Sequence, residues 1–69
     1  MFARQRTVAP GERFRPIEIP GTAWEVEEVG PDPLGNPHAR LVLVGDRSTR
    51  RTIACARLLD QRSWTRLSS

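Results

Sequence analysis

The chain has 69 residues, among them 11 arginines, no lysine, 8 acidic residues, one cysteine and one histidine, and a formal net charge of +3. A chain this short buries only about 60% of the surface that its unfolded form exposes, so we expect one small domain. One cysteine excludes an intramolecular disulfide, and one cysteine with one histidine cannot supply the four ligands of a structural zinc site. The longest apolar run, residues 41–44, is far below the roughly 20 residues of a membrane span. We therefore expect a soluble, cytoplasmic protein without a metal, a cofactor or a membrane partner.

Proline and glycine divide the chain into short pieces whose lengths are typical of strands. No stretch repeats apolar residues with the period of a sustained helix. Residues 1–11 predict a flexible N-terminal tail, and residues 12–67 predict a single small domain. The first predicted strand covers residues 13–19. Pro16 confines this strand to an edge or irregular position, because proline donates no hydrogen bond to a neighbouring strand.

The second predicted strand, residues 22–29, has the alternation of a half-buried strand. Trp24 faces the apolar side, which predicts a core position for its ring, and Glu25 and Glu27 face the other side. The alternation slips at Glu28, which is the effect of one inserted residue. The sequence therefore predicts a β-bulge near Glu27 and Glu28.

The rest of the chain predicts a loop, a hairpin, a helical turn and a last strand. Residues 30–37 contain three prolines and two glycines and predict an exposed, irregular loop. Residues 38–44 form the strongest predicted strand, and the turn residues 45–50 join it in a hairpin to a strand at 51–57. The last predicted elements are a helical turn at residues 58–63 and a short strand at residues 64–67.

Four to five short strands with a helical turn before the last one predict a mainly β fold, namely a small SH3-like barrel. An oligonucleotide-binding barrel usually needs a longer chain and a longer helix. Two groups of residues also carry a family pattern: Pro20, Gly21, Trp24 and Val26, followed by Ile53, Leu58, Leu59 and Asp60. In this pattern the chain resembles short bacterial proteins of unknown function with an SH3-like small β-barrel, over residues 17–65. The resemblance implies the fold and brings no activity with it.

Catalysis would have to depend on Cys55 and His38, the single cysteine and the single histidine. Cys55 lies in an apolar predicted strand, a pattern typical of a small buried side chain with an inert thiol. His38 begins a strand, where a solvent-facing or capping role is usual and a pH-sensing or catalytic role is the alternative. The sequence has no glycine-rich phosphate loop and no serine nucleophile elbow. We therefore expect no enzyme activity.

The charges suggest one class of binding surface. Five acidic residues gather in residues 17–32, between basic segments. We expect Glu25 and Glu27 to pair across the sheet with Arg40 or with an arginine of the hairpin, as exposed side chains on a sheet do. Unpaired arginines would be candidates for contacts to the phosphates of RNA or single-stranded DNA, with only four aromatic residues to assist them. These candidates are Arg13, Arg15, Arg47, Arg50 and Arg51.

A binding module for a protein partner, or for a second copy of the chain, is the hypothesis that we favour from the sequence. If Leu41 and Leu43 point into the core, Val42 and Val44 form an apolar stripe on the outer face of the sheet, together with Ala54 and Ala56. Alternatively, the N-terminal segment folds over this stripe and buries it. Trp64 either fills the end of the barrel or lies exposed as a docking residue. The candidate interface residues are therefore Val42, Val44 and Trp64.

Overall fold

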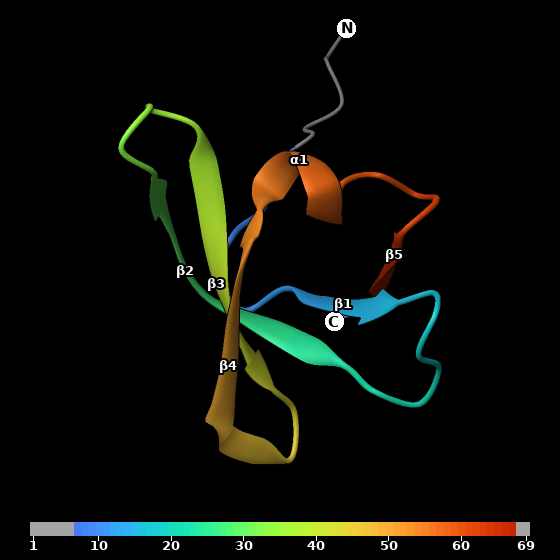
Figure 1. Ribbon diagram of the computed structural model, residues 1–69. Coiled ribbons are helices and arrows are strands. Elements are labelled where there is room, and N and C mark those ends of the chain that lie inside the picture. Colours follow the sequence, from blue (N-terminus) through green and yellow to red (C-terminus); the bar gives the residue numbers. More distant parts are fainter. Residues whose placement is uncertain (1–6, 68–69) are drawn as a thin grey trace, which may run out of the picture.

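A computed structural model describes residues 7–67 of the chain (Figure 1). These residues form one open, antiparallel sheet of five strands in the order β4-β3-β2-β1-β5, with little helix. The elements are β1 (Arg13–Pro16), β2 (Trp24–Pro31), β3 (Pro37–Leu43), β4 (Asp46–Ala54), α1 (Cys55–Leu58) and β5 (Trp64–Leu67). The predictions of a mainly β chain, of a helical turn before the last strand and of the bounds of β5 are therefore confirmed.

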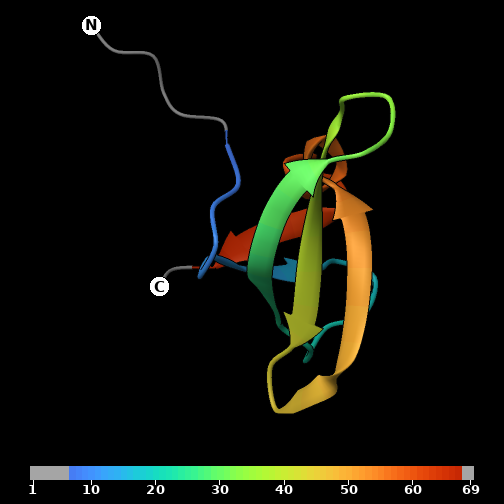
Figure 2. The same cartoon turned by 90° about the vertical axis from the view of Figure 1, so that its left-hand side faces the viewer.

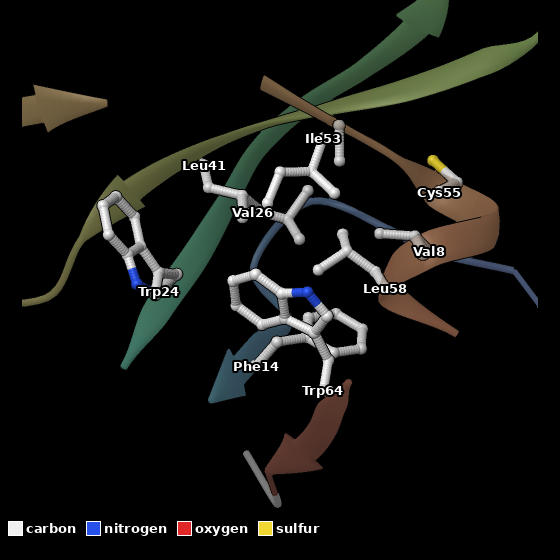
Figure 3. Close-up of a cluster of buried hydrophobic side chains, with 10 residues drawn as sticks. Val8, Phe14, Trp24, Val26, Leu41, Ile53, Cys55, Leu58 and Trp64 are labelled. Atoms are coloured by element: carbon white, nitrogen blue, oxygen red, sulfur yellow. The ribbon is translucent and has the colours of Figure 1, made fainter. Parts of the chain in front are cut away.

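The core lies on the inner face of the sheet, which bends so that β1 and β5 cross behind β2, β3 and β4 (Figure 2). Every strand and α1 contribute buried side chains, as Figure 3 shows for most of them: Val8, Phe14, Trp24, Val26, Ala39, Leu41, Ile53, Cys55, Leu58 and Trp64. The core position predicted for Trp24 is confirmed. Val8 belongs to this core although the sequence analysis assigns it to the tail. The backbones of Gly11 and Glu12 bond to Val26, which holds the segment before β1 against the sheet. The remaining tail, residues 1–6, lies outside the described residues.

β1 is shorter than predicted and lies inside the sheet rather than at its edge. Phe14 pairs with Trp24 of β2 on one side and with Arg66 of β5 on the other. Pro16 pairs with Trp64 of β5 alone, because β2 has already separated from β1 at this point. The missing N–H of proline therefore interrupts no pairing with β2, which is how an internal strand accommodates this residue.

The predicted bulge in β2 is present. Val26 lies opposite Leu41 and Glu28 lies opposite Arg40, so that Glu27 is the inserted residue. The insertion turns Glu27 and Glu28 to the same outer face of the sheet, where each carboxylate reaches an arginine.

Two boundaries along the hairpin and α1 differ from the prediction. The turn is only Val44 and Gly45, and the other predicted turn residues belong to β4, where three extra residues bulge between Asp46 and Arg50. The carboxylate of Asp46 accepts hydrogen bonds from Ser48 and Thr49 and closes this bulge.

The strand predicted at 51–57 ends at Ala54, and the helical turn begins three residues earlier than predicted. The reason is packing, since a helical turn brings Cys55 and Leu58, three residues apart, to one side, where both are buried in the core.

Candidate functional site

The outer face of β2, β3 and β4 carries ion pairs in place of an open charged surface. Arg50 donates to both oxygens of Glu27 at 3.0 and 3.1 Å, and this hydrogen bonding lowers the pKa of Glu27 and raises that of Arg50. Arg13 lies 3.2 Å from Glu25, and Arg40 lies 3.7 Å from Glu28. The pairing expected of Glu27 with a hairpin arginine is confirmed, whereas Glu25 pairs with Arg13 of β1 and not with Arg40 or the hairpin. Of the predicted phosphate-binding residues, Arg13 and Arg50 are therefore already bound to carboxylates.

The predicted apolar stripe on this face does not exist as a surface. Val42 is only 4% exposed, and its neighbours across the strands are Glu25 and Arg50, whose side chains flank it. Val44 is 41% exposed, but it stands alone at the hairpin turn. Trp64 is buried in the core. Val42 therefore offers almost no surface to a partner, and Trp64 offers only the small part, 5%, that is exposed.

The N-terminal segment does not cover this face either. Val8 and Phe14 both pack into the core on the inner face, and Ile17 is exposed.

Arg51 has a position that differs from that of the other predicted arginines. It lies opposite Leu41 and therefore points to the inner face of the sheet. Its guanidinium carbon is 5.6 Å from the centre of the Trp24 ring and 5.9 Å from that of Trp64, within the range of cation–π attraction. Arg51 therefore lies against the two tryptophan rings at the border of the core, where the sheet is open.

A pocket of about 170 Å³ adjoins this arginine. One wall comes from β4 and α1, and the other comes from the end of β1, the β1–β2 loop and the start of β5. We call it the seam pocket, because it lies between the two ends of the open sheet. Its lining residues are Pro16, Glu18, Ile19, Arg51, Arg57, Ser63 and Trp64.

Backbone hydrogen bonds hold the walls of the seam pocket in place. The N–H of Ile17 donates to the carbonyl of Ser63 at 2.9 Å, which ties the β1–β2 loop to the turn before β5. The hydroxyl of Thr22 donates to the carbonyl of Ile19 within the same loop. In the turn, the N–H groups of Ser63 and Trp64 both donate to the carbonyl of Asp60. The pocket is therefore formed before any ligand arrives.

The carboxylate of Asp60 stabilises the same turn. It accepts hydrogen bonds from the backbone and the side chain of Arg62, and the backbone bond is the main cause that lowers the pKa of Asp60.

The two guanidinium groups of the seam pocket have no carboxylate partner. Within residues 7–67, Arg51 and Arg57 form no ion pair, and neither bonds to Glu18 in the same pocket. Ile19, at the rim, is 54% exposed. Arg15 and Arg47 also lack an ion pair, but they lie outside the pocket. The arrangement therefore offers hydrogen-bond donors and apolar surface side by side.

Two of the lining residues were candidates from the sequence, Arg51 as a phosphate contact and Trp64 as an interface residue, and the other five were not. A usable signal was present, because Arg51 is two residues before the buried Ile53 and shares its face of the strand. For Ile19 and Arg57 the only signal was two isoleucines in a loop bounded by prolines and an arginine in the last turn of α1. Neither pattern shows that these residues meet.

Cys55 and His38 do not form a catalytic pair. Cys55 packs in the core, and burial raises the pKa of its thiol, which therefore stays protonated at neutral pH. The Nδ1 atom of His38 lies 3.1 Å from the carbonyl oxygen of Asn36 and 3.7 Å from a carboxylate oxygen of Asp32. The imidazole of His38, a residue of β3, therefore contacts the β2–β3 loop.

Within residues 7–67, no set of three His, Cys, Asp or Glu side chains is placed to hold a metal ion. No helix in this part of the chain has the length and apolar character that a membrane crossing needs. The chain matches no protein-family model, no curated protein and no solved structure.

Proposed function

We propose that the protein is a non-enzymatic binding module, built as a small SH3-like β-barrel, that binds an extended segment of a protein partner at the seam pocket. The strong bend of the sheet and the helical turn before β5 support the SH3-like arrangement. The buried, protonated thiol of Cys55 supports the absence of catalysis.

The observation that carries this proposal is a preformed pocket with an exposed apolar side chain at its rim. Ile19 lines the pocket and is exposed, and Ile17 is exposed in the same β1–β2 loop without lining the pocket. Clustered exposed apolar groups mark partner surfaces, and arginine is enriched in the centres of protein interfaces. The pocket volume of about 170 Å³ is below the roughly 300–1,000 Å³ of sites that enclose a small molecule. The pocket therefore suits one or two side chains of a larger partner.

Electrostatic binding of RNA or single-stranded DNA is the alternative, and the geometry favours it less. Modules that bind single strands combine a basic groove with exposed aromatic rings. Here Phe14, Trp24 and Trp64 are buried, and Phe2 lies outside the described residues. Of the arginines predicted to contact phosphates, Arg15, Arg47 and Arg51 form no ion pair within residues 7–67, and only Arg51 lines the seam pocket.

Selection of peptides from a random library against the purified protein tests this proposal. We expect selected peptides to bind Ile19→Ser at least about fivefold more weakly than the unmodified protein, because the substitution removes apolar surface from the pocket rim. Leu34→Ser is the matched control, since Leu34 is 84% exposed at the tip of a different loop. Its binding should be unchanged.

Two results would contradict the proposal. The first is a set of selected peptides that bind Ile19→Ser and Leu34→Ser equally well. The second is the absence of any selected peptide together with salt-sensitive binding of a labelled single-stranded oligonucleotide, which would support the nucleic-acid alternative.

A further inference from the structure

We infer that the seam pocket recognises a carboxylate. The partner segment would then carry a Glu or Asp side chain and, two residues away, an apolar side chain. This inference rests on the proposed function and adds the chemistry of the ligand. Its basis is the distribution of charged partners over the described residues, together with the position of Arg51.

The acidic residues of the chain are almost all engaged elsewhere. Five of them pair with arginines at distances within 4 Å: Glu12 with Arg66, Glu25 with Arg13, Glu27 with Arg50, Glu28 with Arg40 and Asp60 with Arg62. Asp32 accepts bonds from its own loop and faces His38, and Asp46 holds Ser48 and Thr49. Glu18 alone shares a pocket with unpaired arginines, and it bonds to neither. Arg51 and Arg57 therefore keep their donors for a ligand.

Arg51 is held in place before binding. Its guanidinium lies over Trp24 and Trp64 within cation–π range, and a cation–π contact uses none of the N–H donors of a guanidinium as hydrogen bonds. The edge of a guanidinium fits the two oxygens of a carboxylate, and charge-assisted bonds of this kind are the strong ones. Because the position is fixed, little freedom of the side chain is lost when the ligand binds.

The other residues that line the seam pocket explain why the ligand should carry an apolar side chain as well as a carboxylate. Pro16, Ile19 and Trp64 provide carbon surface beside the two guanidinium groups. Arg51 belongs to β4, which has a partner strand on one side only, so an extended segment can lie along its free side. In an extended segment successive side chains point in opposite directions. A carboxylate and an apolar side chain two residues apart would therefore both face the pocket.

The experiment compares two blocked hexapeptides, Gly-Glu-Ser-Ile-Ser-Gly and its counterpart with glutamine for glutamate, binding to the full chain. The fluorescence of the two tryptophans, with no tyrosine present, reports the contact, because Arg51 touches both rings. We expect the acidic peptide to bind at least about tenfold more tightly than the glutamine peptide. Arg57→Gln should lose most of this preference, and within the described residues Arg57 makes no cation–π contact with either ring. Arg51→Gln should lose it as well.

Arg47→Gln is the matched control, because it changes the net charge equally but lies outside the pocket; its preference should stay within about twofold of the unmodified protein. Glu18→Gln should tighten the binding of the acidic peptide, since it removes a carboxylate that repels the ligand.

Two outcomes overturn the inference. If both hexapeptides bind equally while Ile19→Ser still weakens the library peptides, the pocket binds partners without a carboxylate and the proposed function stands. If Arg47→Gln reduces the preference as much as Arg57→Gln, the attraction comes from overall charge and not from this site.

Discussion

At the residue scale, a few fully buried side chains carry the stability of this domain. Phe14, Leu41, Leu58 and Val26 are the largest side chains that are completely enclosed. In a chain of this size a single core rarely supplies more than about 3–5 kcal/mol of net stability. Each of these residues therefore accounts for a large fraction of the total.

Phe14→Ala should leave the protein largely unfolded at 25 °C. Truncation of a buried phenylalanine costs about 3–5 kcal/mol, which equals the whole stability expected for this domain. Far-ultraviolet circular dichroism during a urea titration measures the effect. Leu34→Ala, at an exposed loop tip, should change the free energy of unfolding by no more than about 0.5 kcal/mol. A cooperative transition of Phe14→Ala at the midpoint of the unmodified protein would show that the core is not organised around this ring.

The alternation of inner and outer residues along β4 predicts the face on which Arg51 lies, but it does not predict the contacts of this residue. The pattern assigns Arg51 to the face of Ile53, but nothing local shows that the sheet is open beside it or that Trp24 and Trp64 approach there. These contacts join residues far apart in the chain. Arg51 was therefore grouped with the arginines predicted to contact phosphates, although its guanidinium lies over two aromatic rings.

At the element scale, the features that were predicted correctly are those with a local signature. The bulge at Glu27 was predictable from one slip in the alternation of apolar and polar residues. The observed bounds of β5 are those predicted. The boundary between β4 and α1 was wrong because the need to bury Leu58, a tertiary effect, decides where the strand becomes helical. The pairing of Glu25 with Arg13 depends on β1 lying beside β2, and no local pattern shows which strand that neighbour is.

The turn between β3 and β4 should depend on glycine at its second position. Gly45 has a φ of +99°, a conformation that other residues rarely adopt, so Gly45→Ala should lower the free energy of unfolding by about 1 kcal/mol. Gly30→Ala is the control, because Gly30 has no positive φ and an added methyl group meets open space there. It should be neutral, or stabilising by about 0.5 kcal/mol. Urea titrations of the two variants provide the comparison, and equal effects at both positions would contradict this account of the turn.

At the scale of the whole molecule, hydrogen-bonded carboxylates make stability depend on acidity. The pKa values of Glu27, Asp32, Asp46 and Asp60 are lowered, mainly by hydrogen bonds from Arg50, Asn36, Ser48 and Arg62 respectively. The folded protein therefore binds these protons less readily than the unfolded chain does. The resulting stabilisation is complete above the ordinary carboxyl pKa of about 4 and is lost as the pH falls through the lowered values.

Thermal unfolding followed between pH 8 and pH 2 should show this dependence. We expect a nearly constant Tm above about pH 5 and a steady decrease below about pH 4. Glu27→Gln should flatten part of the decrease, because glutamine does not titrate in this range. A Tm that stays constant down to about pH 2.5 would mean that these hydrogen bonds do not distinguish the folded from the unfolded state.

The open sheet leaves β4 with a free side, and this strand and its hairpin carry Arg47, Arg50 and Arg51. Two molecules that joined β4 to β4 would bring six guanidinium groups together, two of them already neutralised by Glu27 of their own chains. Repulsion among the other four opposes the growth of a continuous intermolecular sheet, a hazard of exposed strand edges. Arg51, proposed above as a contact of an acidic segment, thereby also acts with Arg47 to discourage aggregation, and this protection weakens as salt screens the repulsion.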